Sequence, residues 1–230
     1  IKLKNNKRSY GSEGMDLRLQ YSSDIQIFTL GYRSTKDSED RFQIYEYSNW
    51  SEGKLGALTV GSLPGYSSNN RVTTAEAKAF YINEEVILGS LTLNLGFRSE
   101  EWEILQERFI DAARTAVNKE GGYPRKLADL DNSLIGFGAT YDVSDTTSIF
   151  LGFHDGFTPT SGGADPEEAD NLEAGIRYVT ESTFIELLYF DTDYKNMFGS
   201  CTTSGGAVSE CEIGDSFNAG EAAISGIELV

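Results

Sequence analysis

The sequence is poor in the residues that build most enzyme active sites and metal centres. Its 230 residues include one histidine, two cysteines and four prolines. The single histidine, His154, cannot form a His-rich site alone, and Cys201 and Cys211 lack the second Cys or His pair that a zinc site requires. No run of about 18 apolar residues occurs, which excludes a transmembrane helix. We therefore expect neither a resident metal nor a helical membrane span.

Basic residues are also scarce. The chain has 36 acidic and 19 basic residues and a net charge of −17. Nucleic acid is an unsuitable partner for such a chain, because phosphate binding requires clustered lysine and arginine. The acidic residues Asp165, Glu167 and Glu168 lie in a polar segment without an apolar pocket to shift a pKa. Neither a nucleophile–base pair nor a phosphate-binding loop is recognisable, so we predict that the protein is not an enzyme.

Alternating apolar and polar residues are abundant. One such stretch, from Ser133 to Tyr178, contains three runs in which every second residue is apolar. The runs are Ile135, Phe137, Ala139 and Tyr141; Ile149, Leu151 and Phe153; and Leu172, Ala174, Ile176 and Tyr178. A period of two places each run on one face of a β-strand. The opposite faces carry polar residues, among them Thr92, Asn94 and Arg98, then Asn171, Glu173 and Arg177, and finally Glu186.

Short turns and long loops alternate along the whole chain. We expect short turns near residues 22–24, 82–86, 143–146 and 180–182, and long loops near 34–70, 99–131, 158–169 and 196–215. Outer-membrane barrels place short turns at one end of the strands and long loops at the other. The pattern predicts an all-β fold, an antiparallel transmembrane β-barrel with about nine membrane strands.

Three local features of the loops are also predicted. Residues 42–47 and 58–60 favour a small hairpin. Leu105, Phe109, Ala113 and Val117 recur every four residues, which predicts an amphipathic surface helix. Cys201 and Cys211 lie in a polar, flexible segment that would not bury a free thiol, so we predict a disulfide worth up to about 3 kcal/mol and an oxidising compartment.

Several segments resemble a known family in their order and spacing. They are residues 70–80, 91–98 (LTLNLGFR), 152–159 (GFHDGFTP), 165–178, 189–196 (YFDTDYKN) and 220–228. Together they are similar to strands of TonB-dependent outer-membrane receptors. Glu39–Gln43, Asn70–Val72 and the cysteine segment resemble the ferric citrate receptor-like group within that family.

The resemblance implies a location, a fold and a function. The chain would be part of a 22-stranded barrel that holds a plug domain, in the bacterial outer membrane. Ile1–Lys4 lacks the apolar core of a signal peptide, and Ile227–Val230 ends inside a predicted strand. We therefore expect residues 1–230 to be the middle-to-late part of the barrel, with the plug and the C-terminal strands outside this chain. The expected activity is import of a ferric chelate, either ferric citrate or another siderophore, driven by the TonB energy-coupling protein of the inner membrane. The expected ligand is the chelate itself, and no other cofactor is implied.

An anionic chelate would be bound by arginines near the outer ends of the strands. The candidates are Arg33, Arg41, Arg71, Arg98 and Arg108, with His154 on the lumen-facing side of its strand. Because the loops are acidic, an anion would be repelled unless arginines converge locally. A cationic or neutral ligand is the alternative, so uptake of vitamin B12, nickel or an oligosaccharide stays open. A soluble acidic β-sandwich adhesin or lectin is the alternative from another class.

Overall fold

The regular secondary structure of the chain is entirely β in the part that the computed structural model describes, namely residues 1–60, 70–159, 165–200 and 216–230. The strands are β1 (Lys2–Ser22), β2 (Gln26–Tyr47), β3 (Trp50–Ser51), β4 (Lys54–Leu55), β5 (Thr59–Val60), β6 (Asn70–Leu88), β7 (Leu91–Arg108), β8 (Arg125–Ser144), β9 (Thr147–Thr158), β10 (Glu167–Val179), β11 (Phe184–Ser200) and β12 (Ser216–Leu229). Cys201 and Cys211 lie outside the described residues. In the described residues, no helix is long and apolar enough to cross a membrane.

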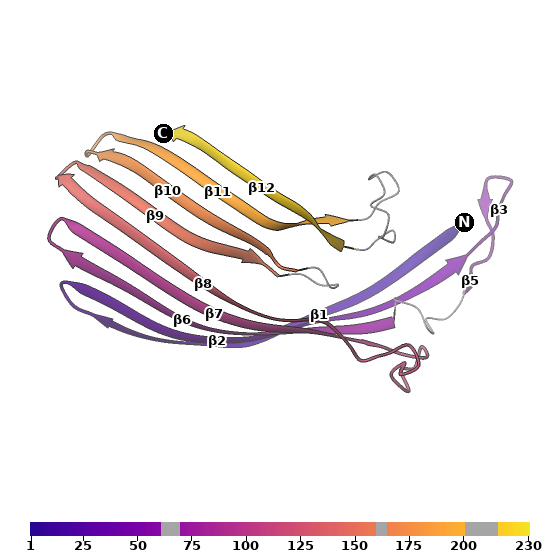
Figure 1. Cartoon of the computed structure of the whole chain (residues 1–230). Helices are drawn as coiled ribbons and strands as arrows, with labels where there is room; N and C mark the ends of the chain where they lie inside the picture. The colour runs from indigo at the N-terminus through magenta and orange to yellow at the C-terminus, as the bar shows by residue number, and fades with distance from the viewer. Residues whose placement is uncertain (61–69, 160–164, 201–215) are drawn as a thin grey trace. The chain divides into compact units, whose positions relative to one another are not determined.

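The main sheet is a meander of nine long strands (Figure 1). Its order is β1-β2-β6-β7-β8-β9-β10-β11-β12, with the short strand β5 paired to β2 and a separate two-stranded sheet formed by β3 and β4. Connections of two to four residues alternate with longer ones along this order. The all-β antiparallel fold and the count of about nine long strands are therefore confirmed in the part of the chain described.

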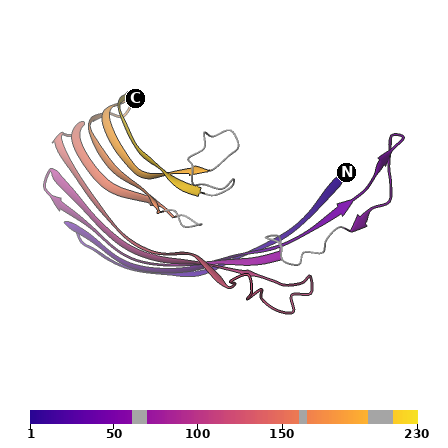
Figure 2. The ribbon, with the colours of Figure 1, turned by 45° about the vertical axis from the view of Figure 1, so that its right-hand side comes forward.

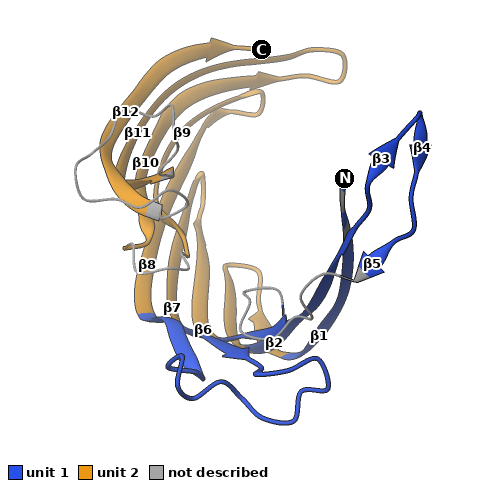
Figure 3. Ribbon diagram, turned by 90° about the vertical axis from the view of Figure 1, so that its right-hand side faces the viewer, with its two compact units in different colours: residues 1–15, 34–77, 102–130 blue, residues 16–33, 78–101, 131–230 orange. Residues whose placement is uncertain are grey.

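The chain divides into two compact units (Figure 3), which are described separately below. Unit 1 contains residues 1–15, 34–77 and 102–130, and unit 2 contains residues 16–33, 78–101 and 131–230. The four short connections all belong to unit 2, whereas the β2–β6 and β7–β8 connections belong to unit 1.

The strands of unit 2 have one apolar and one polar face. From β8 to β12 they lie side by side (Figure 2), and the register aligns Tyr141, Ile149, Ile176, Leu187 and Leu229 across five strands. On the opposite face, Ser148, Arg177 and Glu186 are aligned in the same way. Arg177 pairs with Glu186 at 2.6 Å, so these two residues of the polar face neutralise each other across neighbouring strands.

The apolar face of unit 2 is open rather than packed. Ile149, Ile176 and Leu187 are each 44–46% exposed. Of all described residues, only two apolar side chains are buried, those of Ala79 and Trp102. A water-soluble β-sandwich would bury these aligned side chains in its core, and soluble monomers rarely leave so large an apolar surface uncovered. The exposed face instead matches the lipid-facing band of an outer-membrane barrel.

One predicted turn, four predicted loop boundaries and one predicted element are wrong. Strand β6 runs through the turn expected at 82–86 as far as Leu88, and the chain reverses at Gly89 and Ser90, with Gly89 at a φ of 63°. Within β6, Glu84 accepts a 2.5 Å hydrogen bond from Gln26, so this acidic segment is held in the sheet. Strands β2 and β7 also extend to Tyr47 and Arg108, well into the regions predicted as loops. Strand β8 begins at Arg125, inside the loop predicted at 99–131, and β11 extends to Ser200, inside the loop predicted at 196–215.

The helix predicted from Leu105 to Val117 does not form. Leu105 still belongs to β7, and the backbone of Phe109 pairs with that of Val117 in an isolated β-bridge. Between them the chain turns at Arg114, which has a φ of 58°. The four-residue spacing of apolar residues therefore spans a strand end and a turn. The hairpin predicted from residues 42–47 and 58–60 is confirmed, since Glu46 pairs with Val60 and Tyr47 with Thr59.

Candidate ligand-binding site

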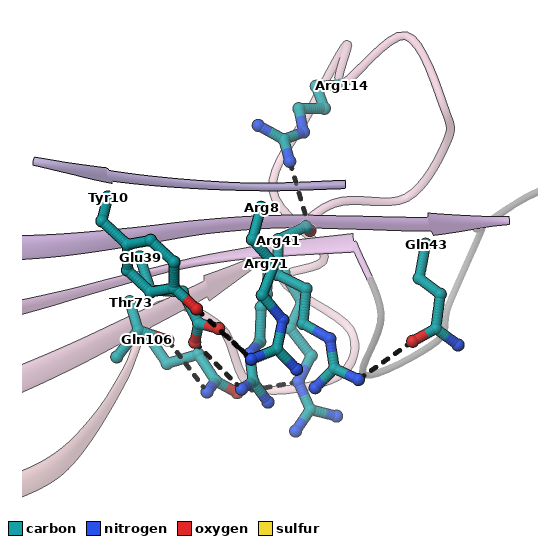
Figure 4. Close-up of polar contacts among 10 residues, drawn as sticks. Arg8, Tyr10, Glu39, Arg41, Gln43, Arg71, Thr73, Gln106 and Arg114 are labelled. Atoms are coloured by element: carbon teal, nitrogen blue, oxygen red, sulfur yellow. Dashed lines mark hydrogen bonds and ion pairs between the residues drawn. The ribbon is translucent and has the colours of Figure 1, made fainter. Parts of the chain in front are cut away.

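Three of the predicted arginines come together in unit 1 with a fourth from β1. The arginine cluster consists of Arg8 (β1), Arg41 (β2), Arg71 (β6) and Arg108 (β7), on four strands that are neighbours in the sheet. Figure 4 shows Arg8, Arg41 and Arg71 pointing to the same side of the strands. Gln106, which accepts a hydrogen bond from Arg108 at 2.9 Å, itself donates to Thr73 at 3.3 Å. This chain of contacts links Arg108 to the β6 face that carries Arg71.

The cluster has fewer carboxylates than guanidinium groups. Glu39 lies between Arg8 and Arg71 and is 3.3 Å from each. Arg41 donates to the neutral Gln43 at 3.0 Å, and Arg108 stacks 4.7 Å from the centre of the Tyr123 ring. Among the described residues, neither Arg41 nor Arg108 has a carboxylate partner within 4 Å. Four cations against one anion leave three positive charges here, in a chain whose net charge is −17.

Several nitrogen atoms of the cluster and of the adjacent Gln43 are buried without a partner. They are Nε of Arg41, Nε of Arg71 and Nε2 of Gln43, none of which has a hydrogen-bond acceptor among the described residues. Gln43 is only 1% exposed. A buried donor left without an acceptor costs about 1–3 kcal/mol. These donors therefore favour an oxygen-rich anion as a ligand, because it would supply acceptors and neutralise the excess charge.

The other predicted site residues belong to unit 2. Arg33 is exposed and has no carboxylate partner in the described part of the chain. Arg98 is satisfied by Glu100, with hydrogen bonds of 3.1 and 3.0 Å, and lies 6.0 Å from the Tyr81 ring centre. Within unit 2, His154 lines a cavity of about 470 Å³ whose lining also includes four glycines, Gly96, Gly136, Gly138 and Gly152. These three residues are not part of the arginine cluster.

Sequence reasoning missed several members of the site. Arg8, Gln43 and Gln106 were not singled out as ligand candidates, although Gln43 and Gln106 each lie two residues from a predicted arginine. A spacing of two on a strand puts both side chains on one face. That signal could have found the two glutamines, whereas Arg8 depends on pairing between β1 and β2 that the sequence does not reveal.

Comparison with known proteins identifies the fold and the family. A family model described as TonB dependent receptor-like, beta-barrel, matches residues 3–230. The chain belongs to this family of TonB-dependent receptor β-barrels. As a member, it is part of an outer-membrane β-barrel, in agreement with the open apolar face of unit 2.

Solved structures have the same fold at low sequence identity. The ferric citrate transporter FecA in the unliganded form is 18% identical, with a TM-score of 0.68 over 99% of this chain and 32% of that one. The FrpB iron transporter from Neisseria meningitidis is 14% identical, with a TM-score of 0.65 over 97% of this chain and 33% of that one. The ferric yersiniabactin uptake receptor FyuA from Yersinia pestis is 19% identical, with a TM-score of 0.59 over 99% and 33%. The chain spans about a third of the length of each of these structures.

Proposed function

We propose that the chain is part of a TonB-dependent receptor that imports an anionic ferric chelate, with ferric citrate as the leading candidate. We further propose that residues 1–230 form the middle-to-late part of the barrel wall, and that the inner-membrane TonB protein powers transport. The observation that carries this proposal is the arginine cluster. The structural matches to proteins named as transporters or receptors for ferric citrate, iron and ferric yersiniabactin support iron uptake as the class of function.

The chemistry of the cluster suits a polycarboxylate. A guanidinium group presents donors in a planar fork that matches the two oxygens of a carboxylate, and such pairs are stronger than neutral hydrogen bonds. Arg41 and Arg108 have no described carboxylate to neutralise them, and Nε of Arg71 is unused. A citrate complex would bring several carboxylate oxygens to these donors. The net negative charge of the whole chain does not prevent binding of an anion, because the charge of the arginine cluster is positive.

The test is a binding titration of the full-length receptor in outer-membrane vesicles with ferric citrate. Replacing Arg41, Arg71 or Arg108 by glutamine removes one charge-assisted contact, worth about 1.5–3 kcal/mol, and should weaken binding by roughly 10-fold to 150-fold. Lys126→Gln is the matched control, because Lys126 is already paired with Glu103 at 2.5 Å and Asp129 at 2.8 Å and lies outside the cluster. The dissociation constant of Lys126→Gln for ferric citrate should equal that of the wild type.

Other cargoes are distinguished in the same assay. Vitamin B12, a nickel chelate and an oligosaccharide are titrated alongside ferric citrate. Tight binding of one of these, unaffected by the three arginine substitutions, would refute the proposal. A neutral ferric hydroxamate serves as a second iron compound, and it should bind at least ten-fold more weakly than ferric citrate if charge recognition dominates.

A further inference from the structure

A fifth arginine, Arg114, contacts the strands of the cluster from the connection between β7 and β8. Its two terminal nitrogens bind the Asp40 carboxylate at 2.8 and 2.5 Å, and its Nε donates to Asn70 at 2.9 Å. One terminal nitrogen also lies 3.4 Å from the carbonyl oxygen of Arg41. The guanidinium carbon is 4.8 Å from the ring centre of Phe109 and 5.9 Å from that of Phe42. Every nitrogen of Arg114 therefore already has a partner within unit 1.

The partners of Arg114 are the sequence neighbours of the three site arginines. Asp40 and Phe42 flank Arg41 on β2, Asn70 precedes Arg71 on β6, and Phe109 follows Arg108 at the end of β7. Consecutive side chains of a strand point to opposite faces of the sheet. Figure 4 accordingly shows Arg114 on the side of the strands opposite to Arg41 and Arg71. Arg114 thus contacts β2, the first residue of β6 and the residue that follows β7, at the level from which the site arginines project.

Hydrogen bonds within the turn hold Arg114 in place. The side-chain amide of Asn70 donates to the backbone carbonyl oxygen of Asp111 at 2.6 Å, and the backbone carbonyl oxygen of Asn70 accepts from the backbone amide of Phe109 at 3.1 Å. The carboxylate of Asp111 accepts hydrogen bonds from the amide and the hydroxyl of Thr115. The φ of 58° at Arg114 costs about 1–2 kcal/mol for a residue with a Cβ. The hydrogen bonds of the turn and of the Arg114 side chain together offset this cost.

We propose that Arg114 is a positioning residue that fixes the spacing of Arg41, Arg71 and Arg108 from behind the sheet. This inference rests on the proposed function, since it assumes that these three arginines bind one anion together. Several guanidinium groups can contact one ligand only if their separations are held to about 0.5 Å. The bidentate pair with Asp40, the bond to Asn70 and the stacking on Phe109 connect the strands that carry them. Arg114 acts on the ligand through these strands and does not touch it.

The test measures affinity and the number of sites separately, in the full-length receptor with ferric citrate as the probe. Arg114→Gln should raise the dissociation constant about ten-fold while the number of sites per receptor stays the same. Arg114→Lys keeps the charge but not the fork, and it should give an intermediate value. Asp40→Asn should behave like Arg114→Gln. Arg177→Gln removes a comparable pairing, with Glu186 on β11, and is the matched control whose affinity should not change.

A purely structural role gives a different result. If Arg114→Gln only reduces the fraction of folded receptor, the number of sites falls and the dissociation constant stays at its wild-type value, which overturns the proposal. A binding titration of Arg114→Gln that matches the wild type also overturns the proposal. If Arg41→Gln still weakens binding in that case, the proposed function stands. Failure of the wild type to bind ferric citrate refutes the proposed function instead.

A measurement without ligand keeps the inference testable in that case. Arg114→Gln should increase amide hydrogen exchange at residues 39–43 and 70–73 by at least several-fold, and Arg177→Gln should not. Equal exchange in the wild type and Arg114→Gln would show that Arg114 does not hold these strands, whatever the ligand is.

Discussion

Gly31 and Gly152 should respond in opposite ways to the same substitution. A Cβ added at Gly31 would lie 2.0 Å from Cζ of Tyr81 and 2.4 Å from its hydroxyl oxygen, which is far inside van der Waals contact. A Cβ added at Gly152 would meet no atom within 4 Å. Both residues belong to unit 2, and neither has a positive φ that would itself favour glycine. The pair therefore isolates the effect of the Tyr81 ring.

The expected change in stability follows from the displacement of the Tyr81 ring by the added methyl group. Forcing an extra methyl group into a packed site costs about 1–3 kcal/mol. Displacement of Tyr81 also weakens its contact with Arg98, which at 6.0 Å contributes about 0.5–1 kcal/mol. Alanine recovers about 0.4–1 kcal/mol by restricting the unfolded chain. Gly31→Ala should therefore destabilise by about 1–3 kcal/mol, and Gly152→Ala should stabilise by about 0.4–1 kcal/mol.

The assay is urea unfolding of the full-length receptor in lipid vesicles, followed by the gel mobility difference between folded and unfolded barrels. The change in free energy is read from the shift in the urea midpoint at constant slope. The double variant Gly31→Ala and Tyr81→Ala measures the coupling energy between the two positions. Removal of the Tyr81 ring should abolish most of the destabilisation caused by Gly31→Ala. Equal shifts for Gly31→Ala and Gly152→Ala, or a penalty that persists without Tyr81, would refute the reasoning.

Two further predictions concern the two faces of the sheet and the acid sensitivity of the Arg114 contact. Leu151→Arg, in the open apolar face, should destabilise the folded receptor by about 2–4 kcal/mol in the same unfolding assay. Thr140→Arg, on the opposite face, should destabilise it by less than about 1 kcal/mol. Similar losses of stability for the two variants would contradict the assignment of the faces. The hydrogen bonds from Arg114 hold the pKa of Asp40 below its ordinary value, so the contact stabilises the fold above the unfolded pKa of about 3.9. The protection factors of the amides at residues 109–117, which are exchange rates corrected for the intrinsic pH dependence, should therefore stay constant from pH 7 to about pH 5 and fall only below about pH 4. A loss of protection near pH 6 would contradict the assignment to Asp40, because its carboxylate is still ionised there.

The wall of the barrel could be predicted because its signal is local. Alternation of apolar and polar residues sets the faces of β8 to β11, and the observed register of Ile149 with Ile176 and Leu187 follows from it. Turns with a local sequence signal, such as that before Thr147, were placed within a residue or two. The one misplaced turn, at 82–86, has an equally polar sequence, and it is held in β6 by Gln26 of another strand.

The extent of the strands and the composition of the cluster could not be predicted in the same way. Residues 34–47 and 99–108 alternate poorly, because both their faces carry polar side chains outside the apolar band. Pairing with neighbouring strands extends β2 and β7 through these residues. Arg8, Glu39 and Arg71 are brought together by pairing between strands that are distant in sequence. Three of the six predicted ligand residues belong to the cluster, and their contact with a ligand stays a prediction.

The length of β2 has a consequence for how such a receptor can vary. A membrane crossing needs about 9–11 strand residues, and β2 has 22, so regular sheet carries Glu39, Arg41 and Gln43 well past the crossing. The β2–β6 connection can therefore change in sequence without altering Arg41 or Arg71, which belong to the strands that it joins. The β7–β8 connection has less freedom, because it contains Arg114, whose side chain binds Asp40 on β2 and Asn70 on β6.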